Sequence, residues 1–403
     1  MGTILGLQGG SKEVLNKLNI ILDQGGKVEA VWIQDWVGKR KTSIGSRLNW
    51  TWELDTTVYQ NFDAFKVYLN DRNIKLLGYV NPFFAEEGKY ISEGISKEYF
   101  IKKKNGAAQQ FNYGGMKGYM LDIFNPKAYN WMKNIIKYNL IDNGFDGWMA
   151  DFAEWYPIDN ATILSDVEKH NEYPVLWNKL NYEVVKESGK EIFFFNRSGG
   201  NETARYSSMM WLGDQMVDYT CEDGLCSVFD GYLSAALAGL PLVHSDVGGY
   251  TGVKKPIIKN LIRSHDVLID WMILEAFTPT FRSHEGLLPD DFVQVYDEEL
   301  VDSYIYFSNI NRSLRQYFKQ LISKREIGNQ VVKPIPEDML SGKLYTKGFM
   351  VGNEIIILFE SSVPSIDGYK KIAPDFRYYN HYKVSVHILN EGQVEKLLPK
   401  DGF

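Results

Sequence analysis

Short apolar runs alternate with longer amphipathic segments from Thr3 to Arg282, and this alternation restricts the fold more than any other feature of the sequence. Several runs are rich in Val, Ile or Phe and lack strict polar alternation, which is typical of strands buried on both faces of a parallel sheet. Eight runs are predicted to be strands: residues 3–7, 28–33, 75–81, 147–150, 191–196, 209–212, 241–244 and 278–282.

Amphipathic segments between these runs have helical spacing. In residues 11–24, apolar side chains such as Val14, Leu18 and Ile21 recur on one face, and the two glycines that follow end the helix. A second helix is expected over residues 126–143, where proline suits the first turn. Eight strands joined by helical crossovers predict a (β/α)8 barrel.

The pattern also predicts how the chain divides into domains. Residues 1–328 are expected to form the catalytic barrel, with an excursion at about residues 83–119 that is rich in Gly, Lys and Tyr. Residues 329–403 contain alternating segments such as KLYTKGFMVGNEIIILFESS, which are typical of antiparallel strands. A small C-terminal antiparallel β domain is therefore predicted.

Composition excludes several classes of function. The net charge of −7 leaves no basic face for nucleic acid. No apolar run is long enough for a membrane span, and the N-terminus lacks the segments of a signal peptide. Because a secreted chain of this length would more often carry several disulfides, the two cysteines, Cys221 and Cys226, are expected to be reduced in a cytoplasmic protein. The 14% aromatic content suits either a large core or sugar binding.

Polar side chains follow many of the predicted strands. In a parallel barrel the carboxyl ends of the strands converge on one mouth, where active sites are built. The side chains at these ends are mostly Asp, Arg and His, with an asparagine after the third strand: Asp35, Asn81, Asp151, Arg197, Asp214, Asp246 and His284.

Cleavage of a glycosidic bond suits such a set of side chains, because it needs one carboxyl group to protonate the leaving oxygen and a second to stabilise or trap the sugar cation. Asp151 and Asp214 are candidates because each follows an apolar run. Spacing alone does not rank them above other carboxylates, notably Asp35, Glu154 and Asp246. The sequence lacks the common metal, phosphate-loop and serine-nucleophile motifs, and we expect no metal and no cofactor.

Three segments, GWMADFAEWYP, HSDVGGY and FRSHEG, resemble glycoside hydrolase family 31, and within it the sulfoquinovosidases. These enzymes cleave α-glycosides of sulfoquinovose, a glucose in which a sulfonate replaces the 6-hydroxyl group. The resemblance implies a retaining mechanism in which Asp151 is the nucleophile and Asp214 is the acid/base. It implies a small sulfonated glycoside as the substrate, with no nucleic acid or membrane partner.

The resemblance also implies a binding site for the sulfonate. Sulfoquinovosidases share two glutamines, an arginine, a tryptophan and a tyrosine, and this sequence matches them at Gln8, Gln34, Arg47, Trp50 and Tyr250. The arginine and the indole N–H would bind the sulfonate directly, the tyrosine would act through water, and the glutamines would bind ring hydroxyls. A buried arginine without an anion would be costly, which favours a sulfonated substrate over a neutral one.

Further positions follow from the same resemblance. Arg197 and His284 would contact sugar hydroxyls, Asp35 and Trp148 would line the mouth, and Asp246 would either orient the site or cap local backbone. Members of the family usually carry an N-terminal β-sandwich, whereas here the first predicted strand begins almost at Met1. A partner chain or a second copy is expected to cover the face that this sandwich would occupy. Two alternatives stay open: a neutral α-glucosidase or α-xylosidase, and a non-catalytic sugar-binding protein.

Overall fold

The computed structural model describes residues 2–42, 45–113, 115–158, 164–207, 209–240, 242–255, 258–324, 330–340, 342–363, 366–372 and 383–399. The chain divides into two compact units. Unit 1 comprises Met1–Gly6, Asn16–Glu29 and Met209–Phe403, and unit 2 comprises Leu7–Leu15 and Ala30–Ser208. Helix α1 (Ser11–Asp23) has residues in both ranges, and its buried face carries the Val14, Leu18 and Ile21 side chains expected from the sequence.

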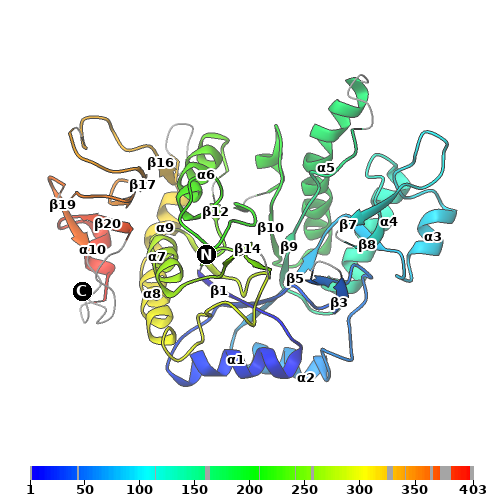
Figure 1. The fold of residues 1–403 in the computed structure, drawn as a ribbon, viewed down its shortest axis with the longest axis horizontal. Helices are drawn as coiled ribbons and strands as arrows, with labels where there is room; N and C mark the ends of the chain where they lie inside the picture. Colours follow the sequence, from blue (N-terminus) through cyan, green and yellow to red (C-terminus); the bar gives the residue numbers. More distant parts are fainter. Residues whose placement is uncertain are drawn as a thin grey trace. The chain divides into compact units, whose positions relative to one another are not determined.

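Unit 2 contains four adjacent parallel strands: β2 (Ala30–Ile33), β5 (Lys75–Val80), β9 (Gly147–Ala150) and β10 (Phe193–Asn196). Figure 1 labels the last three of them. Gly147 is required where β9 meets β10, because a Cβ atom there would lie 2.3 Å from the carbonyl oxygen of Phe193. All four residues of β9 are buried, as the continuous apolar run GWMA predicts.

Three helices of unit 2 are α2 (Phe62–Asn70), α4 (Pro126–Ile136) and α5 (Leu164–Ser188). Of these, α4 begins with an ordinary N-terminal cap. The side chain of Asn125 accepts a hydrogen bond from the backbone N–H of Lys127, and Pro126 occupies the first turn of α4. Directly after α4, residues Lys137–Ile141 form a π-helical turn, so the helical segment ends close to the predicted position 143.

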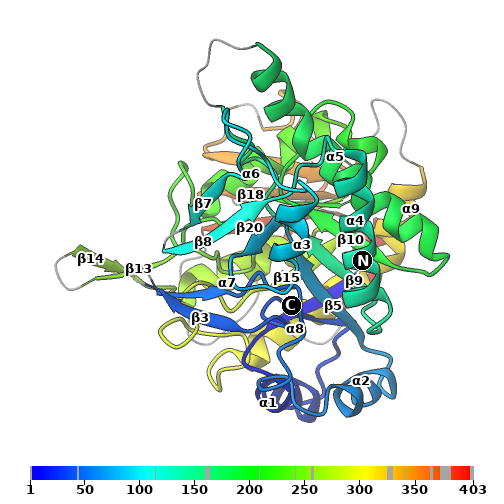
Figure 2. The same cartoon turned by 90° about the vertical axis from the view of Figure 1, so that its right-hand side faces the viewer.

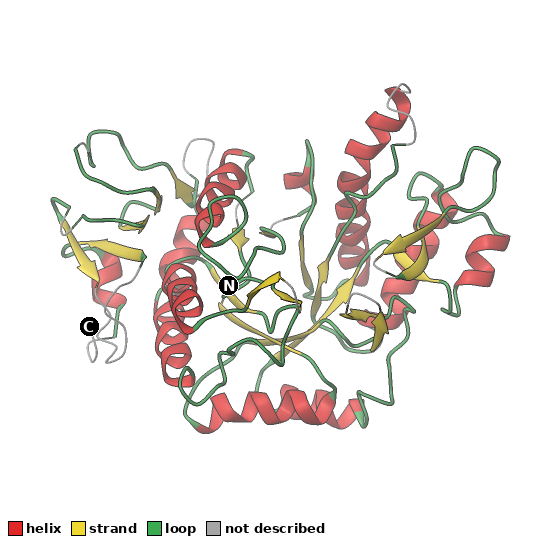
Figure 3. Cartoon of the chain, viewed as in Figure 1, coloured by secondary structure: helices red, strands yellow, loops and turns green. Residues whose placement is uncertain are grey.

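The predicted excursion is a small subdomain of unit 2. Strands β6 (Phe83–Ala85), β7 (Gln110–Tyr113) and β8 (Met116–Met120) form an antiparallel sheet in the order β6-β8-β7, with helix α3 (Ile91–Ser96) between β6 and β7 in the chain. Figure 3 shows its strands in yellow. A two-stranded hairpin of β3 (Lys39–Thr42) and β4 (Gly45–Leu48) precedes it.

Unit 1 holds the other four parallel strands. Strand β1 (Gly2–Leu7) pairs with β15 (Thr280–Ser283), and β11 (Met209–Trp211) pairs with β12 (Leu242–His244). Val247, just after β12, forms a parallel bridge to Ser283. The eight strands have the order β12-β11-β10-β9-β5-β2-β1-β15, and they are the eight predicted from the sequence. The fold is a (β/α)8 barrel with a C-terminal antiparallel sheet.

The helices of unit 1 are α6 (Leu225–Leu237), α7 (His265–Ala276), α8 (Val301–Ser313) and α9 (Arg315–Ser323). Every residue of α7 from Val267 onward is buried, which explains its apolar sequence. Between β12 and α7 lies the hairpin of β13 (Val253–Lys255) and β14 (Ile258–Leu261), seen at the left of Figure 2.

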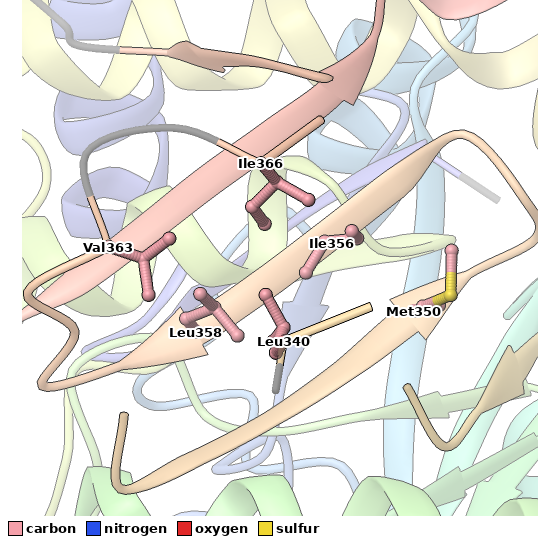
Figure 4. Packing of buried hydrophobic residues seen from close by; sticks show 6 residues of the cluster. All are labelled: Leu340, Met350, Ile356, Leu358, Val363 and Ile366. Carbon is pink, nitrogen blue, oxygen red and sulfur yellow. The ribbon is translucent and has the colours of Figure 1, made fainter. Parts of the chain in front are cut away.

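The C-terminal part of unit 1 is a five-stranded antiparallel sheet, followed in the chain by helix α10 (Gln393–Leu397). Its strands, in the order β16-β17-β18-β20-β19, are β16 (Val332–Lys333), β17 (Lys347–Val351), β18 (Ile355–Phe359), β19 (Tyr369–Ile372) and β20 (Val384–Leu389). Figure 4 shows the apolar cluster on this sheet, formed by Leu340, Met350, Ile356, Leu358, Val363 and Ile366. The predicted boundary at 328/329 lies outside the described residues.

Candidate functional site

Asp151 directly follows β9 and is buried, with 6% of its surface exposed. The two residues after it, Phe152 and Ala153, have φ angles of 57° and 87°. A left-handed backbone is costly for residues other than glycine and is retained mostly where a tight turn has a function. Here it makes a sharp turn, in which the backbone N–H of Phe152 donates to Oδ1 of Asp151 at 2.8 Å.

Two further donors hold the Asp151 carboxylate. The Tyr79 hydroxyl, near the end of β5, donates to Oδ2 at 2.5 Å. Nη1 of Arg197, directly after β10, lies 3.1 Å from Oδ1. Burial, together with the negative charge of Asp151, raises the pKa of Tyr79 well above its ordinary value, so the phenol keeps its proton and stays a donor. Three adjacent strands therefore orient one carboxylate with three hydrogen-bond donors.

Arg197 joins this carboxylate to a second one. Its Nη2 atom pairs with Glu154, and its guanidinium lies 4.4 Å from the centre of the Phe152 ring. The structure thus brings Arg197 next to Asp151, as expected for two residues at strand ends. It also gives Glu154, a rival carboxylate on sequence grounds, a role as partner of the arginine.

Gln8, Gln34 and Asp35 are brought together near the ends of the first two barrel strands. Oε1 of Gln8 accepts hydrogen bonds from Lys39 Nζ at 2.7 Å and from Gln34 Nε2 at 3.5 Å. Asp35 accepts from the backbone N–H of Gly9 at 2.9 Å and from the Tyr59 hydroxyl. All three predicted residues are buried, so their amide and carboxylate groups are held in fixed orientations.

Trp50 packs against the turn that carries Asp151. Its ring meets Phe152 edge-on with centroids 5.4 Å apart, and it stacks on Phe83 at 5.2 Å. The residue is 8% exposed, and its indole Nε1 is a buried donor without a hydrogen-bond partner among the described residues. An unsatisfied buried donor costs about 1–3 kcal/mol, so this N–H is an energetic cost within the described part of the fold.

Arg47 lies three residues earlier, on β4, and is half-buried. It stands directly opposite Arg40 across the β3–β4 hairpin. Arg40 is neutralised by Glu87 at 2.5 Å and bonded to Asn49 at 2.7 Å, whereas Arg47 makes no ion pair with the described residues. Of the two facing arginines, Arg40 is therefore the one with a charged partner among the described residues.

The structure does not bring Trp148 to this cluster. Its side chain is fully buried, and its indole N–H donates to the side-chain oxygen of Asn181 on α5 at 2.8 Å. The residue therefore packs β9 against a helix, which is a structural role. Two residues were missed from the sequence: Tyr79, hidden in the apolar run KLLGYV, and Lys39, part of a basic run.

The remaining predicted residues belong to unit 1. Asp214 follows β11 and is partly exposed, and its main-chain oxygen accepts from the Thr251 hydroxyl at 2.8 Å. Tyr250 meets His284 edge-on, with ring centroids 4.8 Å apart. Nδ1 of His284 accepts from the backbone N–H of Gly286 at 2.8 Å, which leaves Nε2 to carry the proton of the neutral ring.

Asp246 forms a fully buried ion pair with Arg282, and both side chains are 0% exposed. Burial raises the pKa of Asp246, and the charge of Arg282 opposes this rise. Nε of Arg282 also donates to Nε2 of His244 at 2.8 Å. Burial and the neighbouring arginine lower the pKa of His244 well below its ordinary value, so the ring accepts this bond as a neutral group.

Next to this pair, the buried side chain of Glu275 on α7 receives several hydrogen bonds. Ser245 donates to Oε1 through its backbone N–H, at 2.9 Å, and through its hydroxyl, while Tyr232 and Thr278 donate to Oε2 at 2.7 and 2.8 Å. Burial raises the pKa of Glu275 to about 7 despite these bonds.

The free energy of unfolding should therefore fall as the pH rises from about 4.5 to about 7. In this range the folded state keeps a proton on Glu275 that the unfolded chain has released. The loss from this one group is about 3 kcal/mol. We expect Glu275→Gln to flatten this dependence, measured as the urea midpoint at pH 5 and pH 7.5. Parallel changes in the two proteins would show that Glu275 does not titrate in this window.

The cysteines differ from the prediction. Cys221 and Cys226 form a disulfide bond with a Cα–Cα distance of 4.4 Å, so the expectation of reduced thiols is wrong for this structure. Within the described part of the chain, no cluster of three or more His, Cys, Asp or Glu side chains is arranged to hold a metal ion. Among the described helices, none combines the length and apolar character needed to cross a membrane.

Comparison with known proteins identifies the family. Residues 10–321 match the model of the glycosyl hydrolases family 31 TIM-barrel domain. The chain is 36% identical to a sulfoquinovosidase of Escherichia coli over 365 residues, which cover 88% of this chain and 53% of that protein. It is 35% identical to a sulfoquinovosidase of Agrobacterium fabrum, with 83% of this chain and 50% of that protein covered.

A solved structure supports the same relationship. A family 31 sulfoquinovosidase from E. rectale, in complex with an aza-sugar inhibitor, superimposes with a TM-score of 0.84 and 33% identity, over 100% of this chain and 64% of that one. The chain spans about half the length of the curated relatives it matches. On the evidence of the barrel and of these matches, the chain belongs to glycosyl hydrolase family 31.

Proposed function

We propose that the chain hydrolyses α-sulfoquinovosides with retention of configuration and releases sulfoquinovose. In the first step a carboxylate oxygen of Asp151 attacks the anomeric carbon, while the bond to the leaving oxygen breaks and Asp214 gives that oxygen its proton. In the second step Asp214 takes a proton from water, and the water oxygen displaces the Asp151 ester. The relatives that are named sulfoquinovosidases support this choice of substrate.

The environment of Asp151 supports its role as nucleophile. Its carboxylate is bound by a phenol, a guanidinium and a backbone N–H, which hold it in a fixed orientation for attack. Because these donors are already in place, no reorganisation is needed when charge is transferred to the sugar. The neighbouring Arg197–Glu154 pair keeps the guanidinium from turning away.

The observation that carries the choice of substrate is the indole N–H of Trp50. It is buried without a partner among the described residues, in a ring that packs on Phe152, one residue after Asp151. A sulfonate oxygen is a strong acceptor, and the half-buried Arg47 on the neighbouring hairpin strand supplies the opposite charge. A neutral CH2OH group would leave this arginine without an anion.

We expect Arg47→Met to lower kcat/KM for an aryl α-sulfoquinovoside on the order of 100-fold, because charge-assisted hydrogen bonds worth about 2–3 kcal/mol are lost. The same change should alter the rate on the matching aryl α-glucoside by less than about threefold. The measurement is the ratio of kcat/KM for the two substrates, in the unchanged protein and in the variant.

Arg40→Met is the matched control, since Arg40 stands opposite on the hairpin and is already paired with Glu87. This variant should leave the substrate ratio unchanged. If the Arg47 variant lost kcat/KM equally on both substrates, Arg47 would not bind the sulfonate. A preference of the unchanged protein for the glucoside would favour a neutral α-glucosidase instead.

A further inference from the structure

The main chain around Asp214 is held by one short loop of unit 1, residues 246–251, which we name the glycine loop. Gly248 and Gly249 have φ angles of 90° and 73°, a conformation that side chains rarely adopt. The backbone N–H of Gly249 donates to the carbonyl of Asp246 at 2.8 Å and closes the turn. A Cβ atom on Gly248 would lie 2.8 Å from Nε of Arg263, so the turn has no room for a larger residue.

The end of the glycine loop is bonded to the segment that carries Asp214. The backbone N–H groups of Tyr250 and Thr251 both donate to the carbonyl of Gln215 at 2.9 Å. The carbonyl of Thr251 accepts from the backbone N–H of Val217 at 3.1 Å. The Thr251 hydroxyl donates to the main-chain oxygen of Asp214 itself at 2.8 Å, so a side chain of the loop also binds this residue.

Arg263 donates hydrogen bonds to the backbone of the glycine loop. Only 2% of its surface is exposed, and its Nε atom donates to the carbonyl of Gly248 at 2.9 Å, while Nη2 donates to the carbonyl of Gly249. Its guanidinium lies 4.9 Å from the centre of the Phe292 ring. A charged group that donates to both glycine carbonyls fixes the position at which Tyr250 and Thr251 leave the turn.

We infer that Thr251 is a positioning residue for the acid/base Asp214, an inference that rests on the proposed function. The hydroxyl fixes the peptide that follows Asp214 and therefore limits how far the Cα atom that carries its carboxyl group can shift. Displacement of a catalytic carboxyl group by a fraction of an ångström weakens proton transfer more than it weakens substrate binding. The loss should be greatest for leaving groups that cannot depart without a proton.

The test uses Thr251→Val, which keeps the shape of the side chain and removes the hydroxyl. We expect kcat/KM for an alkyl α-sulfoquinovoside to fall about tenfold, because the Asp214 carbonyl loses its partner. For a dinitrophenyl α-sulfoquinovoside, whose leaving group needs no proton, kcat/KM should fall less than about twofold. Thr251→Ser keeps the hydroxyl and should restore the alkyl substrate to within about threefold of the unchanged protein.

Two controls separate this inference from the assignment it rests on. In Asp214→Ala, kcat/KM must also fall more for the alkyl substrate than for the dinitrophenyl substrate, and by a larger factor. An equal fall in kcat/KM for both substrates would overturn the acid/base role of Asp214 itself. If Asp214→Ala shows the split but Thr251→Val lowers both substrates equally, Thr251 is only structural and the inference is wrong. Thr251→Ala, which also lacks the hydroxyl, gives the same comparison if the valine variant does not fold.

Discussion

Replacing Asp151 with asparagine is expected to lower turnover of an aryl α-sulfoquinovoside by about 10⁴-fold or more, while the protein still folds. An amide has nearly the shape of the carboxylate, and its oxygen can still accept from Tyr79 or from the backbone N–H of Phe152. It cannot form the glycosyl ester, so the first chemical step fails. The measurements are steady-state rates on the aryl substrate and far-UV circular dichroism on heating.

Glu154→Gln is the matched control for this variant, because Glu154 is a nearby carboxylate that pairs with the same arginine, Arg197. Its loss should cost far less activity than the loss of Asp151, since it acts only through the guanidinium. Retention of a tenth or more of normal turnover by the Asp151 variant would show that another group is the nucleophile. A collapse of turnover in Glu154→Gln alone would point to Glu154.

The second large effect concerns stability. Arg282→Met should destabilise the fold by about 3–5 kcal/mol, because it leaves the charge of Asp246 buried without its partner. His244 would lose its donor in the same variant. Urea unfolding followed by tryptophan fluorescence measures the effect.

Two comparisons make this expectation specific. The double variant Arg282→Met, Asp246→Leu should recover most of the lost stability, because an apolar pair needs no compensation for buried charge. Arg205→Met is the surface control, since its ion pair with Glu202 is largely exposed, and it should change stability by less than about 0.5 kcal/mol. If Arg282→Met lay within that range too, the buried pair would not be important for folding.

The barrel was predictable because most of its strands are short, largely apolar runs between amphipathic segments. That same property hid the direction of individual side chains. In GWMA every residue is buried, so no alternation shows that Trp148 packs against α5. Tyr79 was missed for this reason too, because its hydroxyl is the only polar side-chain group in the last five residues of β5.

The site depended on a different kind of information. Two aspartates and the sulfonate signature could be found by resemblance, but the partners of Asp151 come from β5 and β10, which are far apart in the chain. These residues lie close together because β5, β9 and β10 are neighbours in the sheet, and a single sequence does not give the order of the strands. The disulfide was missed because the number of cysteines does not show that Cys221 and Cys226 approach within bonding distance.

The fluorescence of Trp155 can report on binding close to Asp151. It is 48% exposed, whereas the other nine tryptophans are buried or half-buried. Its ring meets that of Phe152, the residue next to Asp151, with centroids 5.8 Å apart. Aqueous iodide would therefore quench chiefly this indole, and shielding from iodide would register a molecule bound near Asp151 without any attached dye.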